Sequence, residues 1–388
     1  MEMKENVDFY DLDDLLTEEE RSIRATVGRF VDEECMPIIA DYFDKGIFPM
    51  DLIPRFADMG LFGVHVDGYG CKERNHTTYG LVSQELGRCD SGLRAMFSVQ
   101  NSLVMFPVYR FGSEEQRRKW LPKMANGEVI GCFGLSEPGF GSNPGGMVTR
   151  AHKNGKSYIL NGKKMWITNG TIARVAIVWA KLDDEIKGFL VETDRPGFKA
   201  SPIQRKFSYR TSPTALLTMK DCEIPESNML PNTKGLNSIF QCLNNARYGV
   251  ACGAVGSAVA CYQTARAFAL DREVFDKPIA SYQLVQERLA HMIVEITKAQ
   301  LVNYRLGRLL DENRATPAQI SLAKMNNVRE AMKIARTARD IMGARGILAD
   351  HHVIRHLCDL EAVSALEGTD GMHTLVIGQA LTGIPAFR

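Results

Sequence analysis

The chain contains 388 residues, of which 45% are hydrophobic and 24% charged, the balance of an ordinary folded protein and not of a disordered one. Lys and Arg number 47 against 46 Asp and Glu, so the net charge of +1 gives no basic surface for nucleic acid or an anionic membrane. No apolar run approaches the roughly 20 residues that a membrane helix needs.

The two features that bear on compartment are the N-terminus and the cysteines. The segment MEMKENVDFYDLDD is acidic and polar, unlike a secretory signal or a mitochondrial transit peptide. The nine cysteines include no C-x-x-C pair, which is typical of free thiols in a reducing compartment. We therefore expect a cytoplasmic protein with no membrane span.

Residues 1–128 are predicted to form an N-terminal helical domain. Glu18 to Phe30 carries apolar residues at helical spacing, and 77–88 and 114–125 show the same pattern. Ser113 is a predicted N-cap, because acidic and amide side chains follow it in the first turn.

Residues 129–235 are predicted to form a middle, β-barrel-like domain. Short strand-like runs occur at 157–160, 165–168, 176–180, 188–191 and 216–219. The Asn161-Gly162 dipeptide between the first two runs favours a type I′ hairpin turn.

Residues 236–388 are predicted to form a C-terminal four-helix bundle domain, which makes the fold class α+β. Thr316-Pro317 is a typical helix start, and that helix should end near Met342. Small residues in 249–260 indicate close helix packing. A further long helix is expected over 281–312, whose apolar face would comprise Leu284, Val285, Leu289, Met292, Ile293 and Ile296.

Two local patterns yield no familiar site. The loop Gly139-Phe-Gly-Ser-Asn-Pro-Gly-Gly146 fails the G-x-G-x-x-G pattern, because Pro144 takes the place of the third glycine. It is either a surface turn or a loop able to hold a phosphate. His351, His352 and His356 form the only histidine cluster, but H-E-x-x-H is absent and no metal site is expected.

The segment Ala365-Leu-Glu-Gly-Thr-Asp-Gly371 places a carboxylate, Glu367, between an apolar helix and a glycine-containing turn. A partly desolvated carboxylate has a raised pKa and suits general-base chemistry. The alternative is a helix-terminus charge beside a glycine C-cap. The residues by themselves leave both interpretations open.

Taken together, these segments resemble the acyl-CoA dehydrogenase family over essentially the whole chain. Cys132-Phe-Gly-Leu-Ser-Glu-Pro-Gly-Phe-Gly-Ser142 is followed by Trp166-Ile-Thr168 and Asp271-Arg272 with Phe275, then by Ala338-Arg-Asp-Ile-Met-Gly343 and Leu366-Glu-Gly-Thr369. Within the family the chain looks most similar to glutaryl-CoA dehydrogenases. That similarity lies in Ser91-Gly-Leu-Arg94, Ser98-Val-Gln-Asn-Ser-Leu-Val-Met105, Cys242-Leu-Asn-Asn-Ala-Arg-Tyr-Gly249 and His352-Val-Ile-Arg-His356.

The resemblance implies an FAD-dependent enzyme in which Glu367 removes the α-proton of an acyl-CoA thioester while the β-hydride goes to the flavin. Electron transfer flavoprotein would take the electrons. The FAD-binding residues it implies are Phe133, Gly134, Leu135, Ser136, Gly141, Ser142, Trp166, Ile167, Thr168, Arg272, Phe275, Gln283, Met342, Gly343 and Thr369. Because Arg272, Gln283, Met342 and Gly343 would reach a neighbouring subunit's FAD, a homotetramer built as a dimer of dimers is expected.

For the substrate, the resemblance implies contacts from Arg94, Ala95, Ser142, Phe240, Asn244, Arg247 and Gly368. Arg94 matches the position that holds the distal carboxylate of glutaryl-CoA, and its alternative role is a structural ion pair. Gly87, Ala95 and Leu366 replace the Glu, Ser and Tyr usual in glutaryl-CoA dehydrogenases, which suggests a roomier and more apolar pocket. Ala344 and Asp370-Gly371 are further departures, near the flavin and the base.

Three interpretations therefore remain. The first is a glutaryl-CoA dehydrogenase, with or without decarboxylation to crotonyl-CoA. The second is a dehydrogenase of another acyl group, branched, cyclic or short, attached to CoA or to a carrier protein. The third is a flavin-binding relative associated with DNA, which would need a basic surface that the net charge of +1 does not suggest and would not need Glu367.

Overall fold

A computed structural model describes residues 7–386. Along the chain, a group of helices comes first, a seven-stranded sheet follows, and a second group of helices completes the described part. The first helices are α1 (Glu18–Phe30), α2 (Met36–Lys45), α3 (Leu52–Asp58), α4 (His76–Cys89), α5 (Ser91–Ser98), α6 (Phe106–Phe111) and α7 (Glu114–Ala125). Ser113 caps α7 with a reciprocal capping box to Gln116, as the sequence predicts.

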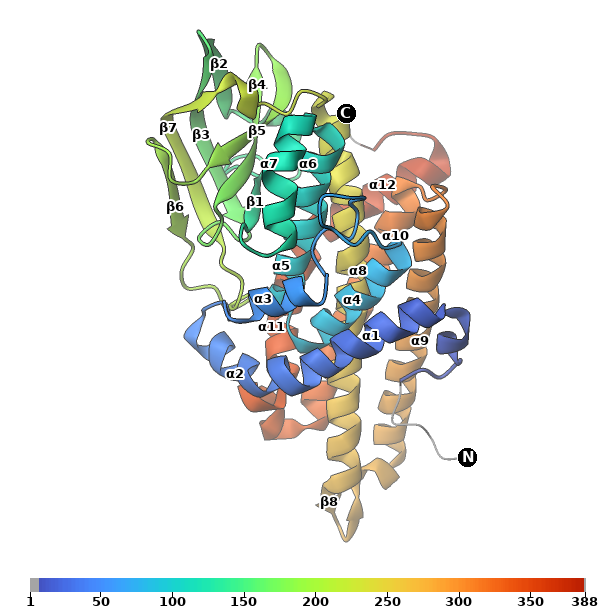
Figure 1. Ribbon diagram of the computed structural model, residues 1–388. Helices are drawn as coiled ribbons and strands as arrows, with labels where there is room; N and C mark the ends of the chain where they lie inside the picture. The colour runs from blue at the N-terminus through green and yellow to red at the C-terminus, as the bar shows by residue number, and fades with distance from the viewer. Residues whose placement is uncertain (1–6, 387–388) are drawn as a thin grey trace.

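The sheet follows in sequence and packs on the side of α6 and α7 (Figure 1). Its strands are β1 (Gly131–Gly134), β2 (Arg150–Asn154), β3 (Ser157–Ile167), β4 (Val175–Leu182), β5 (Glu185–Glu192), β6 (Phe198–Pro202) and β7 (Ala215–Pro225). The pairing order is β1-β4-β2-β3-β7-β6, with β5 on β4. The strand-like runs at 176–180, 188–191 and 216–219 are confirmed within β4, β5 and β7.

The predicted hairpin at Asn161-Gly162 is wrong. The strand β3 continues through both residues, and its register with β7 shifts between Leu160 and Gly162. A Cβ on Gly162 would lie 2.4 Å from Thr149 Oγ1, so this glycine serves a close approach inside the sheet. The tight turn lies earlier, where Asn154 pairs with Ser157 across Gly155 and Lys156.

The C-terminal helices form a bundle around the long helix α8 (Gly235–Asp271), which contacts α4, α9, α10 and α11. The remaining elements are β8 (Glu273–Val274), β9 (Lys277–Pro278), α9 (Gln283–Asp311), α10 (Pro317–Ile341), α11 (Val353–Ala365) and α12 (Asp370–Thr382). The Thr316 cap of α10 is confirmed. On α9, Met292 and Ile296 are buried, but Leu284 is 72% exposed and lies outside the core, contrary to prediction.

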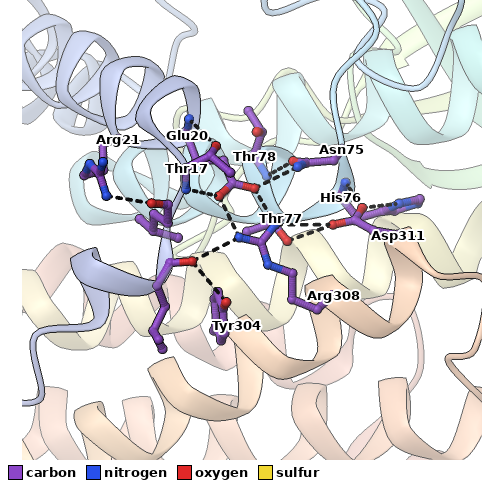
Figure 2. A network of polar contacts seen from close by, with 12 residues as sticks. Thr17, Glu20, Arg21, Asn75, His76, Thr77, Thr78, Tyr304, Arg308 and Asp311 are labelled. Atoms are coloured by element: carbon purple, nitrogen blue, oxygen red, sulfur yellow. Dashed lines mark hydrogen bonds and ion pairs between the residues drawn. The ribbon is translucent and has the colours of Figure 1, made fainter.

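A buried carboxylate joins the N-terminal helices to the bundle (Figure 2). Glu20 on α1 is 1% exposed and accepts hydrogen bonds from Arg308 of α9 at 2.7 Å and from Asn75 at 2.7 Å. On the same face of α9, Asp311 accepts from the Thr77 hydroxyl at 2.9 Å. These charge-assisted bonds fix α1 and α4 against α9. Among residues 7–386, no helix is long and apolar enough to cross a membrane.

Close packing of α4 on α8 depends on glycines, which confirms the interpretation of 249–260. A Cβ on Gly87 would lie 2.4 Å from Gly253 O, and one on Gly256 would lie 2.0 Å from Gln84 O. Real Cβ atoms do not approach backbone this closely, so the two helices meet main chain to main chain.

We predict that Gly256→Ala destabilises the protein by about 1–3 kcal/mol, because the added methyl must push α4 away from α8. Urea unfolding measures the change. Gly378→Ala is the matched control, since a Cβ there meets nothing within 4 Å on α12. Equal stability of the two variants would contradict the packing argument.

Candidate active site

Glu367 lies in the short connection between α11 and α12 and has a left-handed backbone, with φ of 54°. Gly368 follows with φ of 116°, and Thr369 then caps α12 by accepting from Met372 N at 3.3 Å. A left-handed glutamate is strained and persists only where its surroundings hold it. Such strain is common at functional sites, which favours the general-base interpretation of Glu367 over a plain helix end.

Two cations from neighbouring helices hold this connection. Arg247 of α8 donates from Nε to the Glu367 carbonyl at 2.7 Å, and Lys324 of α10 donates from Nζ to the Gly368 carbonyl at 2.8 Å. Lys324 also bonds the Ser364 carbonyl at 3.2 Å. Sequence reasoning missed Lys324, because a lysine inside an amphipathic helix gives no local sign of being 1% exposed. Burial lowers the pKa of Lys324 to about 8.

The Glu367 carboxylate is desolvated and has one oxygen without a hydrogen bond. Its Oε2 is buried and unpartnered within the described part of the chain. Burial raises the pKa of Glu367, while the charges of Arg94, Arg247 and Lys324 limit the rise. A raised pKa makes a carboxylate a stronger base, as the abstraction of a weakly acidic proton requires.

Arg94 on α5 is 3% exposed and lies near Glu367, each side chain affecting the other's pKa. Its Nη2 donates to the Tyr209 hydroxyl at 2.6 Å. Within residues 7–386 no carboxylate forms an ion pair with it, so the structural ion-pair interpretation finds no support. A buried guanidinium that no carboxylate pairs with directly carries a desolvation cost, which a bound anionic ligand would relieve.

The prediction of a roomier pocket is wrong at Gly87. Because Gly87 abuts the backbone of Gly253, α8 occupies the space that a larger side chain at Gly87 would need. The apolar character is present, since Ala95 is 4% exposed and Leu366 packs against the hydrophobic cluster to which Ala95 belongs. Asp370, the other departure near the base, forms a two-bond ion pair with Arg329 of α10 at 2.6 and 2.7 Å.

The residues that the resemblance assigns to the flavin ring lie along β1 and at the end of β3. Phe133, Gly134 and Leu135 are buried on β1 and just after it, whereas the Trp166 side chain is 60% exposed with φ of 65°. Thr168 and Ser136 are half-buried. An exposed aromatic face beside strand backbone and hydroxyl groups fits a flat heterocycle with hydrogen-bonding edges.

The glycine-rich loop, residues 139–146, is anchored by a buried ion pair at Glu137, two residues before its start. Glu137 accepts from Lys164 Nζ at 2.9 Å and from the backbone N–H groups of Val148 and Thr149 at 2.7 and 2.9 Å. Above this anchor, Cβ atoms on Gly139 or Gly141 would meet nothing within 4 Å, and Ser142 is exposed. The loop thus leaves an open shelf that a cofactor or substrate could cover.

The remaining predicted residues lie in three places. Phe240, Asn244 and Arg247 lie together on α8, where Arg247 Nη1 donates to Asn244 Oδ1 at 3.3 Å. Arg272, Phe275 and Gln283 lie at the β8–β9 hairpin, at the end of α8 that is far from the sheet (Figure 1). One chain therefore does not bring this second group to Glu367. The buried Met342 and the exposed Gly343 follow α10. No cluster of metal-binding side chains occurs in the described residues.

The sequence matches three family models in order: acyl-CoA dehydrogenase N-terminal domain at residues 17–128, middle domain at 132–222 and C-terminal domain at 233–382. The chain belongs to the acyl-CoA dehydrogenase family of FAD-dependent oxidoreductases. This confirms the fold class, the enzyme class and FAD as cofactor.

Similar proteins extend this result over nearly the whole chain. A probable acyl-CoA dehydrogenase, YngJ of Bacillus subtilis, is 33% identical over 94% of this chain and 98% of its own. A glutaryl-CoA dehydrogenase from Mycobacterium smegmatis, solved with FADH2, has a TM-score of 0.97 and 50% identity, covering 98% and 99%. A structure described as the electron transferring flavoprotein of Acidaminococcus fermentans has a TM-score of 0.92 and 31% identity, covering 95% and 98%.

We predict that Lys324→Met lowers kcat more than it raises KM, because the Gly368 carbonyl loses its donor and the left-handed Glu367 is free to relax. An unsatisfied buried carbonyl also costs about 1–3 kcal/mol of stability. Steady-state kinetics and thermal unfolding measure both effects. Lys333→Met, at a 70% exposed side chain on the same helix, should leave both unchanged. Unaltered kcat in Lys324→Met would exclude a positioning role.

Proposed function

We propose that this protein is a glutaryl-CoA dehydrogenase that uses Glu367 as the base. The observation that carries the proposal is Arg94, a buried guanidinium near the base with which no carboxylate of the described residues forms a direct ion pair. Glutaryl-CoA would bring the missing anion at the end of its acyl chain, where a fixed guanidinium can pair with it. The 50% identity to a Mycobacterium smegmatis glutaryl-CoA dehydrogenase supports the same substrate.

The proposed chemistry starts from an α-proton that is far too weakly acidic for an ordinary carboxylate. Its removal becomes feasible when hydrogen bonds stabilise the negative charge that develops on the thioester carbonyl. The backbone N–H of Glu367 is suited to this task, since it has no acceptor in the described residues. Bound FAD supplies the hydride acceptor for the β-carbon. Arg94 fixes the far end of the acyl chain, so that the α-carbon stays beside the Glu367 carboxylate.

The proposal assigns one group of residues to FAD and another to the substrate. Phe133, Gly134, Leu135, Ser136, Gly141, Ser142, Trp166, Ile167, Thr168 and Thr369 would hold the flavin side of FAD. Phe240, Asn244 and Arg247 would lie beside the CoA arm, although the Nε of Arg247 is already committed to the Glu367 loop. Ala95 and Gly368 would contact the acyl group and the thioester.

A second candidate is the dehydrogenation of a neutral acyl thioester, branched or short. The apolar side chains of Ala95, next to Arg94 in sequence, and of Leu366, next to Glu367, favour it, because they offer no hydrogen bonds. Under this alternative the charge of Arg94 would serve only to hold Tyr209.

The proposed assembly is a homotetramer that passes electrons to electron transfer flavoprotein. Phe275, Leu284 and Leu381 are 85%, 72% and 81% exposed, and large apolar side chains exposed in this way suit a subunit interface. A second subunit would bring Arg272 and Gln283 to an FAD that one chain cannot reach. The similarity to the Acidaminococcus fermentans structure supports the electron acceptor. Nine free cysteines support a reducing compartment such as the cytoplasm.

The direct test mixes the FAD-loaded protein anaerobically with glutaryl-CoA and an artificial electron acceptor, followed by mass spectrometry of the product. Crotonyl-CoA would show oxidation with decarboxylation, and glutaconyl-CoA would show oxidation alone. Turnover of pentanoyl-CoA without turnover of glutaryl-CoA would overturn the proposed substrate in favour of the neutral thioester.

We predict that Glu367→Gln keeps its bound FAD but loses the bleaching of flavin absorbance that a substrate thioester causes. The amide is close in shape to the carboxylate but cannot accept the α-proton. Stopped-flow absorbance measures the rate, and bleaching as fast as in the wild type would rule out Glu367 as the base.

The pH dependence follows from the same residue. Because burial raises the pKa of Glu367, its protonated fraction grows as the pH falls through that raised value, and protonated Glu367 cannot act as a base. We therefore expect kcat/KM to fall on the acid side with a midpoint above 4.5, the ordinary value for this group. A profile that stays flat down to that ordinary value would contradict the assignment.

We predict that Arg94→Met lowers kcat/KM for glutaryl-CoA by roughly 100-fold, the scale of a charge-assisted hydrogen bond worth about 3 kcal/mol. Pentanoyl-CoA, which has the same chain length and no distal carboxylate, should be affected far less. Equal losses on the two thioesters would assign Arg94 a structural role.

A further inference from the structure

Tyr209 is a buried polar residue to which the proposed reaction assigns no role. It lies in the connection between β6 and β7, and it belongs to the same hydrophobic cluster as Ala95. The side chain is 6% exposed, and its hydroxyl accepts the Arg94 Nη2 hydrogen bond at 2.6 Å. Tyr209 and Arg94 are separated by 115 residues in sequence, so their contact is a product of the tertiary structure.

The backbone of Tyr209 is held in a strained conformation from several sides. Its φ is 53°, in the left-handed region that bulky residues avoid. Its N–H donates to Asp359 Oδ1 of α11 at 2.6 Å, and its carbonyl accepts from Lys206 Nζ at 2.6 Å. Ser208, the preceding residue, accepts from Ala362 N at 3.2 Å. A strained residue held by this many contacts has a fixed side-chain direction.

The hydroxyl has hydrogen-bonding capacity to spare. A tyrosine hydroxyl has one proton to donate and lone pairs to accept with. Because Arg94 donates to it, the hydroxyl proton is free, and it has no acceptor among residues 7–386. The neighbouring Ala95 and Leu366 offer no acceptor side chain either. A buried donor of this kind is costly to leave unpaired, so the site favours a ligand that accepts.

We propose that Tyr209 is a second binding residue for the distal carboxylate of the substrate, donating its hydroxyl proton to the carboxylate that pairs with Arg94. The inference rests on the proposed function and deepens it. Arg94 contributes charge and N–H donors, and Tyr209 contributes an O–H donor already hydrogen-bonded to the guanidinium. Together they form a carboxylate site in which a neutral acyl chain would leave both donors unpaired, and this difference produces specificity.

The test compares kcat/KM for glutaryl-CoA and pentanoyl-CoA in the FAD-loaded wild type and Tyr209→Phe. Phenylalanine keeps the ring and removes only the hydroxyl. The ratio of glutaryl-CoA to pentanoyl-CoA activity should fall by roughly 10-fold to 100-fold, the effect of one hydrogen bond to a charged group. The loss should lie mainly in KM for glutaryl-CoA, with bound FAD unchanged and the melting temperature slightly lowered, because Arg94 Nη2 loses its acceptor in the ligand-free protein.

A matched control is Tyr158→Phe, which removes a hydroxyl from a buried tyrosine of β3, remote from Arg94. It should leave the ratio unchanged. An equal loss on both thioesters in Tyr209→Phe would show that Tyr209 is structural, and an unchanged ratio would show that its hydroxyl does not bind the substrate; either result overturns the inference and leaves glutaryl-CoA as the proposed substrate. Wild-type protein inactive on glutaryl-CoA but active on pentanoyl-CoA would overturn both proposals.

Discussion

The main-chain contact between α4 and α8 is the constraint on which the rest of the structure depends. Gly87, Gly253 and Gly256 let the two helices approach until backbone meets backbone. The same approach places Gly253 against the Arg94 side chain, where a Cβ would lie 2.9 Å from Arg94 Cδ. The long α8 also contacts α10, which carries Lys324, and α11, which Glu367 follows. Without the close approach, neither Arg94 nor Arg247 would keep its position relative to Glu367.

The packed helices hold the strained connection between α11 and α12, which contains Glu367, in place through direct hydrogen bonds. The left-handed backbone of Glu367 and Gly368 would relax if its carbonyls were free. Arg247 and Lys324 occupy those carbonyls from two different helices, so relaxing the loop would require breaking bonds to both. The strain thus depends on tertiary contacts, and the N–H of Glu367, which has no acceptor among residues 7–386, is the donor that the proposed reaction assigns to the thioester carbonyl.

Three cationic side chains lie around Glu367, and one of them, Arg94, lacks an anionic partner that pairs with it directly. Arg94, Arg247 and Lys324 all influence the Glu367 carboxylate, and burial works against each of these ionised groups. Arg247 and Lys324 are satisfied by backbone carbonyls, whereas Arg94 has only the hydroxyl of Tyr209 in the described residues. A substrate that carries its own carboxylate completes the set. The unpaired charge of Arg94 thus links the fold to the proposed substrate more directly than the size of the pocket does.

What the sequence determined by itself is local: the capped starts of α7 and α10, the helical and strand-like regions, and Glu367 within a recognisable Leu-Glu-Gly-Thr segment. Such features are set by neighbours along the chain, through capping, periodicity and turn propensity. Local reasoning failed at Asn161-Gly162, where pairing with β7 overrides the turn, at Leu284 and at Gly87. Only the tertiary structure decided that Lys324 and Tyr209 lie beside the base and Arg94. Their partners are 44 and 115 residues away, and burial of a lysine or a tyrosine hydroxyl arises from packing that no local pattern encodes.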